Sequence, residues 1–257
     1  MTDESLIVKP RDYSDIIKLQ EPGVLEEFFD EPLSFIAETV TGALAAGKAG
    51  WFLASGRIVQ GMLKAKLFQQ FSKEVKKFRD AGKIEKDFAE TKYGGQTWVE
   101  LMRIIDEESP DADRLEALKA MFFAINKVGT TDGERIKAYQ LWQIAKNLNS
   151  GDLLLLKTVF ECKDAYGHSV DPQIRNKYPH WRTSMSSVVS HGSEGLIELH
   201  QKKPTDFGLL TPITPNIMGD IINVRNARLS DLGLAFCANI ETYVVELREV
   251  SVEDGAI

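Results

Sequence analysis

Along 108-ESPDADRLEALKAMFFAINK-127, apolar side chains recur at the three- and four-residue spacing of a helix. Ser109 is expected to cap this helix, and Pro110 to occupy its first turn. The predicted core face carries Leu115, Leu118, Met121, Phe122 and Ile125. This helix and its neighbours predict a mostly α-helical fold.

Helical patterns lie on both sides of this stretch. Upstream, Thr97 is expected to cap a helix whose core face begins at Trp98. Downstream, Thr131 and Glu134 have the spacing of a capping box, and Ser150 is expected to start a further helix. Four short helices with brief polar links predict an antiparallel helical bundle.

The segment 33–80 predicts a long helix. Apolar residues recur at helical steps from Leu33 to Met62, and a one-sided amphipathic pattern continues to Phe78. Each internal glycine costs a helix about 0.5–1 kcal/mol relative to alanine. We therefore expect a break near residues 47–50 or near Gly61.

Within this segment, 41-TGALAAGKAG-50 resembles a phosphate-binding loop that lacks one ligand. The GxxxxGK[ST] pattern needs a hydroxyl for magnesium, but Ala49 occupies that position and no βαβ units follow. A helix instead places small residues on one stripe that lets another backbone approach closely. The stripe, which we expect to be a helix-packing face, consists of Gly42, Ala46, Ala49 and Gly56.

Charge is unevenly distributed along the chain. The net charge of −7 and a pI near 5.3 argue against attraction of the whole protein to nucleic acid. Residues 1–32 contain nine acidic and three basic residues, whereas residues 57–86 contain nine basic and three acidic residues. The candidate contacts of the basic block with anionic lipid or an acidic partner are Lys64, Lys66, Lys73, Lys76 and Lys77.

Residues that could carry catalysis are sparse. The two cysteines form no CxxC pair, and the four histidines between His168 and His200 lack the spacing that directs two rings at one metal ion. The stretch HGSEG has His191 where a nucleophile elbow requires glycine. We therefore expect a protein that is not an enzyme and has no catalytic residue, metal site or cofactor.

The C-terminal part has a different character. A helix is expected over 184–199, then an apolar hairpin with β-branched runs, then a final helix. This order, with the stretch Leu229-Ser230-Asp231-Leu232-Gly233, resembles a winged-helix domain, in which a strand of the wing runs into a helix through Leu-Ser/Thr-x-x-Gly. The resemblance implies a smaller α+β domain after the helical bundle.

A winged helix that binds DNA needs basic side chains on its recognition helix and wing. The candidate contacts with nucleic acid are Arg182, Arg225 and Arg228, but residues 151–257 contain ten basic and fourteen acidic residues. We therefore expect this domain to contact protein rather than nucleic acid.

The expected organisation is an acidic arm over 1–32, a helical domain over 33–150, a winged-helix-like α+β domain over 151–250 and a tail over 251–257. The stretch 101–134 is also similar to a pattern in uncharacterised bacterial proteins, some of them near phage-defence genes. We expect a non-catalytic bacterial interaction or regulatory protein of phage defence, which binds a protein partner or self-associates.

Two alternatives stay open. The first is a membrane-active effector that uses the glycine-rich apolar helix and the basic segment within 33–80. The second is a DNA-binding regulator that acts through the C-terminal domain. The cysteine usage and the absence of a basic start with an apolar run at residues 1–15 predict a cytoplasmic protein, which would reach a membrane only when activated.

Overall fold

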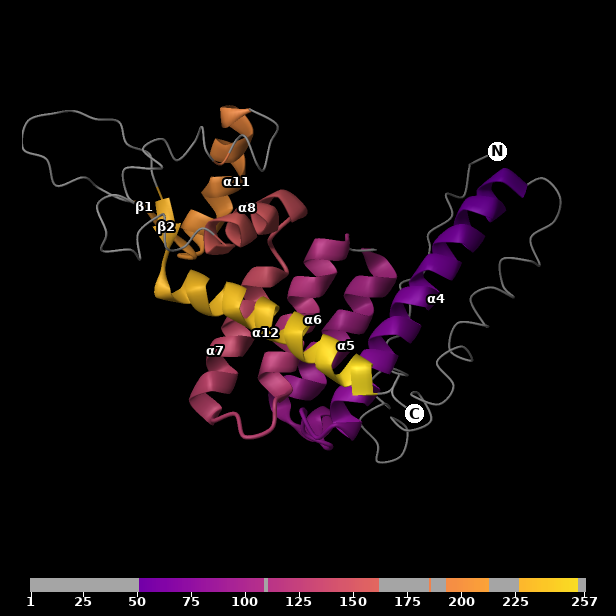
Figure 1. Ribbon diagram of the computed structural model, residues 1–257. Coiled ribbons are helices and arrows are strands. Elements are labelled where there is room, and N and C mark those ends of the chain that lie inside the picture. The colour runs from indigo at the N-terminus through magenta and orange to yellow at the C-terminus, as the bar shows by residue number, and fades with distance from the viewer. Residues whose placement is uncertain (1–50, 109–110, 162–184, 186–192, 213–226, 254–257) are drawn as a thin grey trace, which may run out of the picture. The chain divides into compact units, whose positions relative to one another are not determined.

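The computed structural model describes residues 51–108, 111–161, 185, 193–212 and 227–253 (Figure 1). Over these ranges the chain forms seven α-helices, one 3-10 helix and two short strands, which confirms a mostly α-helical class. Several predicted features lie outside the described residues: the acidic arm over 1–32, Gly42, Ala46 and Ala49 of the small-residue stripe, and Arg182 and Arg225.

The chain divides into two compact units. The first unit contains residues 1–76 and 86–108, and the second contains residues 77–85 and 109–257. The second unit therefore holds helices from both sides of residue 150, where the sequence predicts a domain boundary. That boundary stays a prediction.

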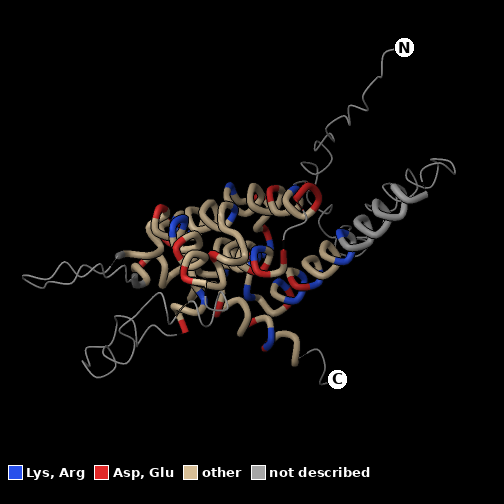
Figure 2. The backbone as a smooth tube through the Cα atoms, turned by 90° about the horizontal axis from the view of Figure 1, so that it is seen from above, with Lys and Arg blue, Asp and Glu red and all other residues tan. Residues whose placement is uncertain are grey.

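The longest helix is α4 (Trp51–Asp80), which is continuous through Gly56 and Gly61. Of the two alternative places predicted for a break, Gly61 shows none, and residues 47–50 lie outside the described residues. Helix propagation is cooperative, so a loss of about 1 kcal/mol at one glycine does not end a helix of thirty residues. Lysine and arginine residues are spaced along the described part of α4 (Figure 2).

The first unit packs the part of α4 around Phe71 against α5 (Lys92–Glu107), which follows η3 (Phe88–Glu90). The Trp98 ring of α5 stacks on Phe71 with a centroid distance of 5.4 Å, and the Phe88 ring meets it edge-on at 5.7 Å. All three aromatic side chains are buried. This aromatic cluster is the core of the unit.

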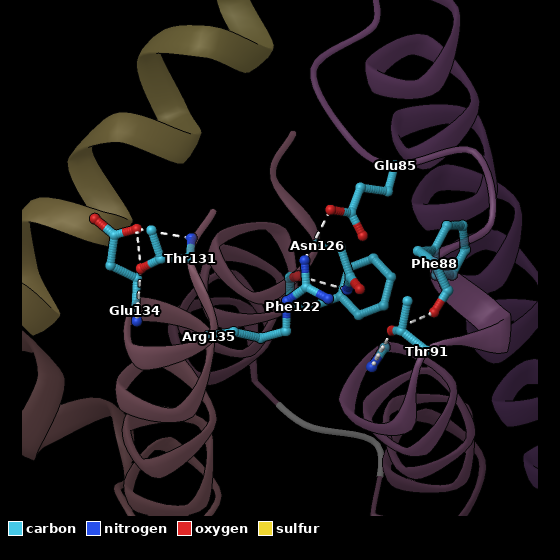
Figure 3. Close-up of polar contacts among 9 residues, drawn as sticks. Glu85, Phe88, Thr91, Phe122, Asn126, Thr131, Glu134 and Arg135 are labelled. Carbon is cyan, nitrogen blue, oxygen red and sulfur yellow. Dashed lines mark hydrogen bonds and ion pairs between the residues drawn. The ribbon is translucent and has the colours of Figure 1, made fainter. Parts of the chain in front are cut away.

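Thr91, not the predicted Thr97, caps α5. Its hydroxyl accepts from the Gly94 amide at 3.1 Å and donates to the Phe88 carbonyl at 2.8 Å (Figure 3). Thr97 is buried inside the helix and donates to the Tyr93 carbonyl. The prediction placed the helix too late because two adjacent glycines are typical of a loop, whereas here they lie buried in the first turns of α5.

The second unit is built around α6 (Ala112–Asn126), on which α7 (Asp132–Ala145), α8 (Ser150–Glu161) and α12 (Asp231–Glu253) all pack. The side chain of Asp111 caps α6 by accepting from the Arg114 amide at 2.9 Å. The prediction of Ser109 as the cap is therefore wrong, because the helix begins at Ala112 and Asp111 is the adjacent residue with a capping side chain.

Two helix starts are confirmed. The Thr131 hydroxyl accepts from the Glu134 amide at 3.3 Å, and the Glu134 carboxylate accepts from the Thr131 amide at 2.9 Å, which forms the predicted capping box (Figure 3). The next helix, α8, begins at Ser150 as predicted. Asn149 and Asp152 secure its first turn by accepting from each other's backbone amides at 3.0 and 3.1 Å.

The C-terminal part of the second unit contains α11 (Glu194–Asp206), β1 (Leu210–Pro212) and β2 (Ala227–Leu229), followed by α12. The two strands pair antiparallel, with Leu210 opposite Leu229. Of the helix predicted over 184–199, most of the first half lies outside the described residues, and α11 continues past Leu199 to Asp206. The winged-helix architecture stays a prediction.

Candidate functional site

The predicted basic contacts all belong to α4, but their surroundings differ. Lys64 forms an ion pair of 3.5 Å with Asp106 of α5 and also donates to its carbonyl oxygen. The Lys77 ammonium donates to the Ser251 hydroxyl at 3.5 Å, and Lys76 is half-buried. Lys66 and Lys73 are the most exposed members of the set. The two exposed lysines, rather than all five, are the cations that a lipid or an acidic partner would meet first.

The apolar side of α4 is occupied by the protein core. Phe71, Val75 and Phe78 are each at most 2% exposed. The Phe78 ring packs on Phe123 at 4.5 Å and on Tyr243 at 5.7 Å within the second unit. A role of this helix on a membrane would therefore require these aromatic contacts to separate. Among the helices described, none has the length and apolar content to cross a membrane.

The predicted Leu-Ser-x-x-Gly stretch forms a tight junction between the strands and α12. The Ser230 hydroxyl accepts from the Gly233 amide at 3.0 Å and donates to the Gly208 carbonyl at 2.5 Å, while the Ser230 amide donates to the Leu209 carbonyl at 3.0 Å. Any Cβ at Gly233 would overlap that carbonyl oxygen. The serine and glycine are therefore required for α12 to begin directly against the residue that precedes β1.

A buried carboxylate joins α8 to α11. The Asp152 side chain is 2% exposed, and its Oδ1 lies 3.1 Å from Nδ1 of His200. The His200 ring rests on Gly151, where a Cβ would overlap the ring atoms. One turn further along α11, the Lys203 ammonium donates to the Asn147 carbonyl at 3.1 Å. These contacts fix which face of α11 points away from α8.

Two leucines of α11 are exposed to solvent. Leu196 and Leu199, one turn apart, are 43% and 61% exposed. Around them the exposed charges are nearly balanced, with Glu194, Glu198 and Asp206 against Lys202 and Lys203. Exposed leucines one turn apart, with both signs of charge around them, are typical of a protein contact. Sequence periodicity alone did not identify this face, because the direction of α11 depends on the pairing of His200 with Asp152.

Of the three predicted nucleic-acid contacts, the structure describes only the backbone of Arg228. Arg228 belongs to β2, where its backbone pairs with Thr211. Arg182 and Arg225 lie outside the described residues. On α11 itself, one of the two cations is engaged with the carbonyl of Asn147.

Potential ligands for a metal do not gather in the described ranges, where no group of three His, Cys, Asp or Glu side chains converges. The thiol of Cys237 is buried and lies 3.7 Å from the Leu156 carbonyl. This cysteine therefore has a place in the packing of α12 on α8.

Comparison of the chain with protein-family models, curated proteins and solved structures gives no match.

Proposed function

We propose that the chain is a non-catalytic interaction protein that associates with a second copy of itself through α11. The observation that carries the proposal is the exposure of Leu196 and Leu199 on one face of that helix. Burial of a leucine side chain is favourable by about 1.5–3 kcal/mol of free energy. Two exposed leucines one turn apart therefore favour an interface over a solvated helix.

The charges of α11 favour a protein partner over DNA. A helix that enters the major groove offers cations to the phosphates, and each neutralised phosphate adds to the affinity. The exposed positions of α11 carry three acids and two lysines, and Lys203 is already bound to the Asn147 carbonyl. The acids would repel a duplex, whereas a protein surface accommodates both signs.

The order of these charges favours a second copy as the partner. Glu198 precedes Lys202 on the same flank of the leucine stripe. In an antiparallel pair of helices related by a two-fold axis, the same flank of each helix meets its counterpart, and the residues along the two flanks run in opposite directions. Leu199 then faces Leu199 of the second copy, and Glu198 faces Lys202 of the second copy. The same patch is thus complementary to itself, as an isologous interface requires.

The experiment is analytical ultracentrifugation of the full chain and of a Leu199→Glu variant. We expect concentration-dependent dimerisation of the unchanged protein and at least a tenfold weaker association of the variant, because a carboxylate replaces the central apolar contact. The control is Leu154→Glu on α8, a leucine that is 42% exposed, against 61% for Leu199, and that lies outside α11. A monomeric unchanged protein, or equal effects of the two substitutions, would contradict the proposal.

The membrane-active and DNA-binding roles each predict a different experimental result. A membrane-active role requires leakage of anionic vesicles that is lost on combining Lys64→Glu with Lys73→Glu. A DNA-binding role requires salt-sensitive retardation of duplex that falls with Arg225→Ala. The setting in bacterial phage defence stays a prediction from the resemblance.

A further inference from the structure

A groove with a volume of about 420 Å³ lies in the second unit between α7 and α12. Both helices pack on α6, whereas they make little contact with each other, so the space between them is open at the surface. The turn over 127–130, in which Gly129 has a φ of 79°, closes one end. The volume falls in the range of roughly 300–1,000 Å³ that is usual for small-molecule sites.

The groove has an apolar floor. Phe123 of α6, Ala138 and Leu141 of α7 and Ala235 of α12 line it. The first three of these side chains are buried and belong to the core, so the floor is held in place by the packing of the helices. The floor is therefore preformed for an apolar group.

Polar groups with unused hydrogen-bonding capacity line the rim. Asn239 of α12 donates to the sulfur of Met121 at 3.9 Å, a weak acceptor. Within the described part of the chain, the hydroxyls of Thr130 and Thr242 make no hydrogen bond, and neither does the Lys137 ammonium. Several convergent polar groups above an apolar floor are the usual arrangement of a ligand site.

Both signs of charge meet at this rim. Glu134 and Lys137 lie three residues apart on α7, which places their Cβ atoms about 5–6 Å apart. The Thr131 backbone amide and hydroxyl bind one carboxylate oxygen of Glu134, which leaves the other oxygen for a ligand. The same hydrogen bonds lower the pKa of Glu134, so its carboxylate is ionised at neutral pH.

We propose that this groove binds a small zwitterion with an apolar body, of the class of the apolar amino acids. The ammonium of the ligand binds Glu134, its carboxylate binds Lys137, and its side chain lies on Phe123 and Leu141. Asn239 supplies a further hydrogen bond. A ligand that carries a single charge can pair with Glu134 or with Lys137, but not with both.

The test is titration of the full chain with L-leucine, followed through the side-chain amide signal of Asn239 by NMR and through the heat of binding. We expect saturable binding that weakens about tenfold for isocaproate, which lacks the ammonium, and about tenfold for isoamylamine, which lacks the carboxylate. No saturable binding of L-leucine would overturn the proposal, and so would equal binding of the three compounds.

Two variants separate this site from weak binding elsewhere on the surface. Glu134→Gln keeps a capping-box side chain at that position, so the fold is retained, but it removes the negative charge. Lys137→Gln removes the positive charge. Each should weaken L-leucine binding about tenfold, whereas Lys157→Gln on the exposed face of α8 should leave it unchanged. Unchanged binding by both α7 variants would contradict the site.

Discussion

Gly151 shows how a single residue type sets the docking of α11. The His200 ring occupies the space next to this glycine and reaches the buried Asp152 carboxylate at 3.1 Å. A side chain at position 151 and the ring cannot both be accommodated without movement. The glycine is thus explained by a contact with a residue almost fifty positions away, which no local sequence pattern predicts.

We predict that Gly151→Ala destabilises the protein by about 1–3 kcal/mol, because the new methyl group displaces the His200 ring from Asp152. In a His200→Ala background the same substitution should be neutral or slightly stabilising, because alanine has a higher helix propensity than glycine. Urea unfolding of the four proteins in this double-mutant cycle measures the coupling. Equal costs of Gly151→Ala in both backgrounds would show that the ring is not the cause.

Glu246 of α12 makes the stability of the second unit depend on pH. Its carboxylate lies 2.8 Å from the Lys127 ammonium and 3.3 Å from that of Lys83. Burial raises the pKa of Glu246, but the hydrogen bonds and charges of the two lysines outweigh it, and the net pKa is lowered. A lowered pKa in the folded state means that the ionised form is stabilising.

We therefore predict that the contribution of Glu246 is present above the ordinary glutamate pKa and is lost as the pH falls through the lowered value. Urea unfolding at pH 7 and at acidic pH should show Glu246→Gln costing up to about 1 kcal/mol at pH 7 and less in acid. Glu249→Gln is the matched control, because that side chain is 58% exposed and lies 3.7 Å from Lys83. A pH-independent effect of Glu246→Gln would refute this assignment.

At the scale of the elements, the helix starts separate what local patterns predict from what they miss. The Thr131 and Glu134 capping box is predicted and confirmed, because both partners belong to one turn. The caps at Thr97 and Ser109 are wrong, since a neighbouring residue with an equally suitable side chain, Thr91 or Asp111, takes the role. Sequence patterns thus identify the helices more reliably than their first residues.

The corrected start of α5 gives a direct test. Thr91→Ala removes the side-chain acceptor of the Gly94 amide and should destabilise the protein by about 1 kcal/mol. Thr91→Ser retains the hydroxyl and should be close to the unchanged protein. Thermal unfolding of both variants measures the difference. If the two variants unfolded at the same temperature, the hydroxyl would not be the stabilising group.

Among the candidate sites, the sequence identifies residue types but not their surroundings. The basic block of α4 is visible as a run of lysines, yet the ion pair of Lys64 with Asp106 depends on how α4 packs on α5. The groove between α7 and α12 has no sequence signature, because its residues come from three helices and a turn. Such sites require the tertiary structure.

At the scale of the whole molecule, long-range packing decides which helices belong together. The second unit joins residues 77–85 with residues 109–257, although residues 86–108, which lie between them in sequence, belong to the first unit. The periodicity of the apolar residues predicts the helical class, but it does not predict this division. The second unit contains α11, whose exposed leucines are the basis of the proposed self-association.

Charge reversal on α11 tests the proposed antiparallel pairing with α11 of a second copy. Glu198→Lys alone and Lys202→Glu alone each place like charges opposite one another in a homodimer, so each variant should dimerise more weakly than the unchanged chain. A mixture of the two variants places opposite charges across the interface again, whereas each helix still carries two like charges at positions 198 and 202. Sedimentation of the mixture should show a heterodimer stronger than either homodimer. Equal association of the mixture and the separate variants would contradict the account.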